Sequence, residues 1–163
     1  MAAYTLTGKI ENLYGGQNVH FRPAKLQPKD FLRAWIEHLA LCVGRKGEKT
    51  ILIGRDGAVT FSPVSSAREE LENLCDLYLL GLSQPIRFFP GTSMAFAEAK
   101  VSGERDSFRM AREKWDPYRR RGEKDDPYFE RCFNGLDPFE DPFAETALKV
   151  FKTMFEQMKR DEP

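Results

Sequence analysis

The sequence predicts an α+β domain in which two hairpins contribute to one sheet and a buried helix packs on that sheet. Three observations support this class. Residues 27–43 form a strongly apolar helical segment, segments of alternating hydrophobicity with glycine turns lie on both sides of it, and helical patterns fill the C-terminal half. We take the helix at residues 27–43 as the element around which the rest of the chain is organised.

The segment 27–43 has the spacing of a buried helix. Apolar residues recur at i, i+4, i+8 and i+11, and neighbouring ones widen this row into a broad stripe: Phe31, Leu32, Trp35, Ile36, Leu39, Cys42 and Val43. Pro28 suits the first helical position, Asp30 places a carboxylate in the positive first turn, and Gly44 can supply a left-handed cap. We expect Trp35→Ala to be the most damaging truncation in this helix.

Two hairpins are predicted, one on each side of the helix. The first joins a strand over residues 4–10 to a strand over residues 19–21 through a glycine-containing turn at residues 15–18. The second joins residues 50–53 to residues 58–61. An Asp-Gly pair lies between these two strands, and that pair favours a tight hairpin turn.

Helical patterns follow from residue 66 to the C-terminus. Five helices are predicted, and their starts are Ser66 with Glu69 as a capping box, Thr92 or Ser93, Asp106 or Ser107, Asp126-Pro127, and Asp141-Pro142. The first of them is expected to bury Leu71, Leu74, Cys75, Tyr78 and Leu82. The last is expected to run through Met158. Residues 85–90 are apolar with a proline at each end, which favours an edge strand or a buried connection.

Length and composition favour a single domain over residues 1–163. The 25 basic and 25 acidic side chains cancel, so net charge provides no attraction to nucleic acid or membrane. Cys42, Cys75 and Cys132 are widely spaced in apolar helical patterns, which indicates reduced core thiols of a cytoplasmic protein. We expect no secretory leader and no membrane contact, because no apolar run has the length of a membrane span.

The sequence predicts no catalytic residue, no metal ligand and no cofactor. His20 and His38 lack the further ligands that a metal site needs, and His38 is interpreted as a histidine at the core boundary. The nucleophile elbow Gly-x-Ser-x-Gly and the phosphate loop Gly-x-x-x-x-Gly-Lys are absent from the sequence. Glu123, Asp125 and Asp126 have the chemistry to hold Mg²⁺, but capping of the helix that begins at Asp126 explains them better.

The densest basic patch is the run Tyr118-Arg119-Arg120-Arg121. Arginines beside exposed rings bind phosphates and stack on bases, and the same residue types are enriched in protein interfaces. Tyr118, Arg119, Arg120 and Arg121 are therefore candidates for DNA binding or for a subunit interface. The sequence favours the interface, because acidic residues at 123–126 follow closely and would partly cancel the field acting on a phosphate.

Several short motifs occur in the same order as in a known family, and the gaps between them are similar. They are Phe21-Arg22-Pro23-Ala24-Lys25-Leu26, Trp35-Ile36-Glu37-His38-Leu39, Arg55-Asp56-Gly57, Tyr78-x-x-Gly81-Leu82-x-x-Pro85, Phe89-Pro90, Ala111-Arg112 and Gly122-Glu123-x-Asp125-Asp126. From about Thr5 to Phe155 the chain resembles the C-terminal region of the exodeoxyribonuclease V gamma chain, the RecC subunit of the bacterial RecBCD helicase–nuclease. The resemblance implies an excised fragment of a larger subunit, with Met1-Ala2-Ala3 as an added start.

The resemblance also implies a degenerate restriction-endonuclease-like core of the PD-(D/E)XK type. An active member carries an acid after a glycine on one strand and an acid-x-Lys motif on the next, which together hold Mg²⁺. Gly8-Lys9-Ile10-Glu11 fits the first strand, but no carboxylate stands two residues before Lys25. The expected function is a non-catalytic structural and DNA-handling domain in double-strand-break repair and recombination. Its expected partners are RecB-like and RecD-like subunits and DNA.

The alternative is an active Mg²⁺-dependent nuclease domain that uses Glu11, Lys25, Glu123, Asp125 and Asp126. That reaction requires two or more carboxylates within metal-bond reach of one point. The positions of these side chains in a structure therefore distinguish the two functions.

Overall fold

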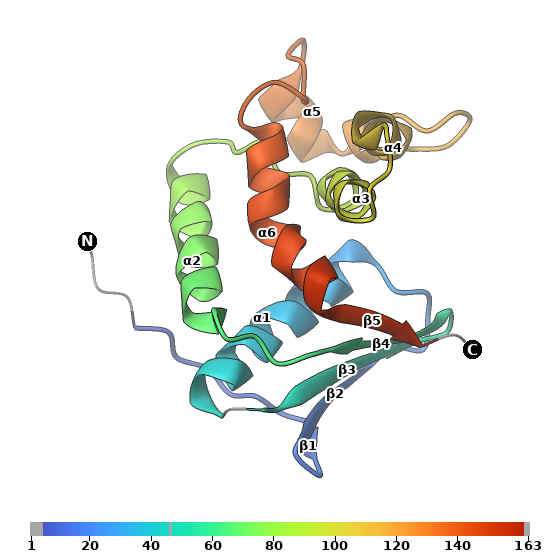
Figure 1. Cartoon of the computed structure of the whole chain (residues 1–163). Helices are drawn as coiled ribbons and strands as arrows, with labels where there is room; N and C mark the ends of the chain where they lie inside the picture. The colour runs from blue at the N-terminus through green and yellow to red at the C-terminus, as the bar shows by residue number, and fades with distance from the viewer. Residues whose placement is uncertain (1–4, 46, 162–163) are drawn as a thin grey trace.

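The computed structural model describes residues 5–45 and 47–161, so the expected added start at residues 1–3 lies outside the described chain. In order, the elements are β1 (Leu13–Tyr14), β2 (Gln17–Phe21), α1 (Pro28–Gly44), β3 (Lys49–Gly54), β4 (Gly57–Phe61), α2 (Ala67–Ser83), α3 (Pro90–Val101), α4 (Ser107–Trp115), the 3-10 turn η1 (Glu123–Asp125), α5 (Pro127–Phe133), α6 (Phe143–Gln157) and β5 (Met158–Asp161). The strands form one sheet in the order β1-β2-β3-β4-β5, and the helices lie on one side of it (Figure 1). The predicted α+β class is confirmed.

The sheet contains the predicted β3–β4 hairpin, a first hairpin that has the predicted turn but a different first strand, and one parallel pair. β1 and β2 pair antiparallel around Gly15 and Gly16, and β3 and β4 pair antiparallel with Gly54 opposite Gly57. β2 and β3 run parallel, because α1 carries the chain across the sheet between them. The predicted strand at residues 4–10 is wrong for residues 5–10, which belong to no strand and are mostly exposed. Alternation alone does not form a strand when neither a pairing partner nor a covering layer is present.

Helix α1 has the predicted position and packs its apolar face on the sheet. Phe31, Trp35 and Leu39 are buried, and the Trp35 ring lies 5.4 Å from the ring of Phe61 on β4. Ile36 and Val43, which were expected inside, are each 41% exposed because they lie at the margins of the stripe. The first turn is capped as expected, since the Asp30 carboxylate accepts the Gln27 N–H at 2.7 Å.

The predicted left-handed cap at Gly44 is wrong. Gly44 is the last helical residue, and Arg45 follows it with a φ of −140° and a ψ of 120°. The chain leaves α1 in an extended conformation because it continues directly towards β3.

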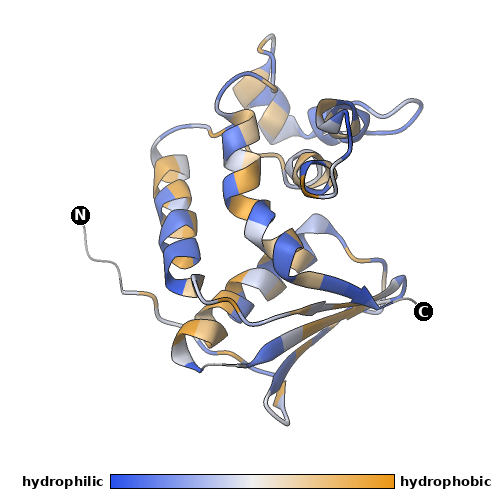
Figure 2. Ribbon diagram, in the orientation of Figure 1, coloured by the Kyte–Doolittle hydropathy of each residue, from blue (hydrophilic) through white to orange (hydrophobic). Residues whose placement is uncertain are grey.

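Helix α2 matches the predicted segment but not the predicted burial. Tyr78 is 68% exposed, Leu82 is also exposed, and Ser66 makes no side-chain capping bond at the helix start. Helix α2 packs against α1 and α6, while apolar colour continues to its C-terminal end (Figure 2). The helical period was correct, but the period does not specify how far a helix is covered by its neighbours.

A second apolar cluster joins α3, α4, α5 and α6. Phe89 is fully buried at its centre, and its ring centroid lies 4.5 Å from that of Trp115 and 5.2 Å from that of Phe133. Residues 85–89 are a connection and not an edge strand; Phe89 is buried in it, residues 86–88 are half-buried and Pro85 is exposed. Helix α3 starts at Pro90, earlier than the predicted caps Thr92 and Ser93, because proline suits its first turn.

The last helix also differs from its predicted bounds. Helix α6 ends at Gln157, and Met158 begins β5, which pairs antiparallel with β4. The free edge of β4 offers backbone partners that a longer helix would leave unused. Asp126 caps α5 as predicted, whereas Pro142 itself occupies the cap position of α6 in place of Asp141. Within the described ranges, no helix combines the length and the apolar character needed to cross a bilayer.

The three cysteines are unpaired, as predicted. Cys42 and Cys75 are half-buried, but Cys132 is exposed, so the prediction of a core position is wrong for Cys132. Burial raises the pKa of the Cys42 thiol, which keeps this thiol protonated at neutral pH.

Candidate functional site: the arginine pocket

The arginine loop, residues 116–122, follows directly from the end of α4. Asp106 caps α4 as predicted by accepting the Arg109 N–H at 2.9 Å, and α4 ends at Trp115, two residues before Pro117. After Pro117 the backbone turns, and Arg119 adopts a left-handed φ of 59°. The loop is therefore a defined turn and not a continuation of the helix.

Gly122 fixes the end of the loop against the end of α4. A Cβ atom at this position would lie 2.1 Å from the Trp115 carbonyl oxygen and 2.4 Å from Pro117 Cδ. Only glycine allows so close an approach of two backbone segments. The Asp125 carboxylate accepts the Gly122 N–H at 2.8 Å and holds the same point from the other side.

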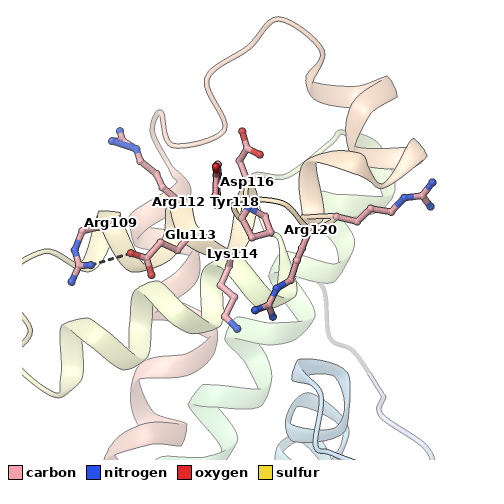
Figure 3. Close-up of a pocket in the computed structure, with 9 residues that line it drawn as sticks. Arg109, Arg112, Glu113, Lys114, Asp116, Tyr118 and Arg120 are labelled. Carbon is pink, nitrogen blue, oxygen red and sulfur yellow. Dashed lines mark hydrogen bonds and ion pairs between the residues drawn. The ribbon is translucent and has the colours of Figure 1, made fainter.

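A shallow cavity of about 700 Å³ lies between the loop and the exposed face of α4. It is lined by Arg109, Arg112, Glu113, Lys114, Asp116, Pro117, Tyr118, Arg120 and Arg121. We call this cavity the arginine pocket. Five basic and two acidic side chains line it, and Figure 3 shows Lys114 and Arg120 extending in the same direction.

Both acidic side chains of the pocket are already paired with cations. Glu113 binds Arg109 at 2.9 Å, and Asp116 binds Lys124 at 2.8 Å. The hydrogen bond that Lys124 donates to the Asp116 carboxylate is the main cause of a raised pKa at Lys124, which therefore stays charged at neutral pH. Within the described chain, no ion pair involves the pocket cations Arg112, Lys114, Arg120 and Arg121.

The acidic residues that follow the loop bind backbone N–H groups. Glu123 accepts the N–H groups of Gly91 and Thr92 at 2.8 and 2.7 Å, and Asp126 accepts the Tyr128 N–H at 2.9 Å. Glu123 thus caps α3, and the expectation that it serves the start of α5 is wrong. Within the described residues these carboxylates form no ion pair with the loop arginines, but they keep their charge, and Arg121 lines a second cavity beside them.

Tyr118 is the exposed aromatic residue of the pocket. Its side chain is 82% exposed, and the Arg119 guanidinium lies 4.8 Å from its ring centroid. The sequence identified the loop residues 118–121 because they are contiguous. It did not indicate Arg109, Arg112 and Lys114, because they are scattered along α4 and join the loop only in space.

The residues of the alternative nuclease site fall in three separate segments: Glu11 before β1, Lys25 between β2 and α1, and the neighbouring Glu123, Asp125 and Asp126 at η1. Glu11 precedes β1, is 65% exposed at its side chain and pairs with Lys9 at 2.8 Å. Lys25 is exposed in the segment between β2 and α1. Across residues 5–45 and 47–161, no group of three His, Cys, Asp or Glu side chains is placed to hold a metal ion.

Comparison with known proteins identifies relatives of this chain. A family model described as RecC C-terminal domain matches residues 1–101. The chain is 33% identical over 148 residues to the RecBCD enzyme subunit RecC of Mycobacterium tuberculosis (strain H37Rv), with 83% of the chain covered. It is 26% identical over 148 residues to the RecBCD enzyme subunit RecC of Escherichia coli (strain K12), with 82% covered.

Each of these matches spans 13% of the relative's own length. The arginine pocket lies beyond the residues that the family model matches, so the family match gives no information about the pocket. The family model covers β1 to α3, which includes the central helix and four of the five strands of the sheet described above. The chain therefore belongs to the RecC C-terminal domain family.

Proposed function

We propose that this chain is a non-catalytic structural and DNA-handling domain of a RecBCD-type exodeoxyribonuclease V complex, acting in double-strand-break repair and recombination. The observation that carries the proposal is the match of residues 1–101 to the RecC C-terminal domain. The curated relatives are named as subunits of the RecBCD enzyme, which supports the same assignment. The proposed site of action is the cytoplasm.

The proposal of a non-catalytic role rests on the carboxylates that an active nuclease would need. Glu123 and Asp126 are bonded to helix N-termini, and Glu11 is paired with Lys9 at an exposed position. Mg²⁺ in a nuclease site needs two or more carboxylates that converge on one point with free oxygens. Both Glu123 oxygens and Asp126 Oδ1 accept backbone N–H groups, which fixes these carboxylates at helix starts and turns them towards the backbone.

We also propose that the sheet and α1 are a degenerate restriction-endonuclease-like core. The missing acid before Lys25 supports this assignment, together with the mixed sheet that is covered by helices on one side. The whole span 1–163 is proposed to fold as one domain. Helix α6 packs on α3, and β5 adds to β4, so the residues beyond the family match complete the same sheet.

The proposed partners are RecB-like and RecD-like subunits. We expect the tagged chain, co-expressed with these subunits of its own organism, to retain at least one of them through affinity purification and gel filtration. The control is the same tag on an unrelated domain of similar size. If both subunits elute without the chain at low salt, the proposed place in the complex is wrong.

A further inference from the structure

We propose that the arginine pocket binds single-stranded nucleic acid, with its cations on the phosphates and Tyr118 stacked on a base. This inference names the ligand class of the candidate site and rests on the proposed function. Its test uses the chain alone, so a failure of subunit assembly does not decide it.

The first step of the argument is the charge left uncompensated in the pocket. Arg112, Lys114, Arg120 and Arg121 line one cavity, while both of its acidic side chains are paired with other cations. Cations that line one cavity without acidic partners favour a ligand with several regularly spaced negative charges. A nucleic-acid backbone has this property.

The second step is the position of the neighbouring acids. Glu123, Asp125 and Asp126 accept backbone N–H groups at 2.7–2.9 Å. None of these three acids lines the arginine pocket, although Arg121 also lines a second cavity beside them. Their charges lower the positive potential of the pocket, but their carboxylates do not occupy the space where a phosphate would bind.

The third step is the exposed ring. Tyr118 is 82% exposed, and an aromatic ring in water gives up the stabilisation that burial would provide. The guanidinium of Arg119 lies against the ring at 4.8 Å. A ring backed by a cation is a platform for an unpaired base, and stacking of this kind tolerates any base sequence. A duplex keeps its bases stacked inside, so the ring favours a single strand.

The fourth step is the rigidity of the loop. The close contact of Gly122 with the Trp115 carbonyl oxygen closes the loop on the end of α4. The left-handed residue Arg119 and the hydrogen bond from Arg120 N–H to the Pro117 carbonyl oxygen at 3.3 Å define the turn. A loop that is ordered before binding loses less conformational entropy when the ligand arrives.

The test measures binding of the purified chain to a labelled oligothymidylate by fluorescence anisotropy, at salt concentrations between about 50 and 300 mM. We expect Arg120→Ala/Arg121→Ala to weaken binding roughly tenfold or more at low salt and to lower the log–log salt slope by about 1.4. Tyr118→Ala should weaken binding at every salt concentration without changing this slope, and Tyr118→Phe should restore it. A duplex of the same length should bind more weakly than the single strand.

The matched control is Arg45→Ala/Arg68→Ala, which removes the same charge at two exposed positions outside the pocket, one just after α1 and one on α2. This control should bind like the unchanged chain. Equal losses in the control and pocket variants would overturn the proposal, because net charge alone would then explain binding. Absence of oligonucleotide binding at low salt would overturn it as well. Loss of subunit co-purification in Arg120→Ala/Arg121→Ala with unchanged oligonucleotide affinity would assign the pocket to a protein interface instead.

Discussion

Trp35→Ala should lower the free energy of unfolding by about 3–5 kcal/mol. Trp35 is 1% exposed, and its ring contacts both Phe61 on β4 and His38 one turn further along α1. Truncation removes this buried surface and leaves a cavity between the central helix and the sheet. Chemical denaturation of the two proteins under identical conditions measures the difference.

The control for this prediction is the adjacent residue Ile36, which is 41% exposed on the same helix. Ile36→Ala removes much less buried surface than Trp35→Ala and gains some helix propensity, so its expected loss is smaller, about 1 kcal/mol or less. A loss of that small size for Trp35→Ala would mean that α1 is peripheral and that the fold is organised around a different element.

His38→Ala is expected to cost about 2–4 kcal/mol at neutral pH. The interpretation of His38 as a boundary residue is wrong, since the ring is fully buried between α1 and the sheet. Its Nε2 lies 2.9 Å from the Ser62 carbonyl oxygen and its Nδ1 lies 3.0 Å from Thr50 Oγ1. The carbonyl can only accept, so Nε2 carries the proton and Nδ1 accepts from the Thr50 hydroxyl. Loss of the ring leaves both groups buried without this partner.

The same geometry predicts a pH dependence of stability. Burial lowers the pKa of His38 below the ordinary value of 6.5, and the hydrogen bond to Ser62 opposes this only partly. The neutral ring is thus favoured in the folded state. Its contribution is fully present above about pH 6.5 and is lost as the pH falls towards the lower folded-state pKa, because the unfolded chain then binds a proton first.

The pH dependence can be separated from that of other groups by His38→Gln, which keeps polar atoms but does not titrate. Between about pH 7.5 and about pH 5.5, this variant should lose less unfolding free energy than the unchanged chain. His20→Gln is the comparison variant, since it removes the other histidine of the chain. Burial also lowers the pKa of His20, while the charge of Glu37 opposes this shift. Identical pH dependence in the His38→Gln variant and the unchanged chain would contradict the assignment of a buried neutral His38.

The local parts of the fold were predictable from the sequence. Helix α1 was found from its apolar spacing and from Pro28, and the β3–β4 hairpin from its Asp-Gly pair. The parallel pairing of β2 with β3 was not predictable in this way. It depends on where α1 returns the chain to the sheet, and short-range turn signals contain no information about that. Strand β5 was not predicted either. Met158 continues the apolar period of α6, so the sequence pattern does not show where the helix ends and the strand begins.

The candidate site was predictable only where its residues are contiguous. Residues 118–121 are visible as one basic run, but Arg109 and Lys114 join them only because the loop folds back beside α4. The role of Glu123 required the structure, since its carboxylate caps α3 at Gly91 and Thr92, more than thirty residues earlier in the chain. A carboxylate near one helix start in sequence can serve another helix start in space.

The central claim is that this RecC-type domain is non-catalytic, and a nuclease assay tests it most directly. The purified chain is incubated with linear duplex and single-stranded DNA in the presence of Mg²⁺ or Mn²⁺, with a known nuclease as the positive control. The account predicts that both DNA substrates remain intact, because no group of three His, Cys, Asp or Glu side chains in the described part of the chain is placed to hold a metal ion. Cleavage that depends on the metal and disappears in Glu11→Ala would contradict it.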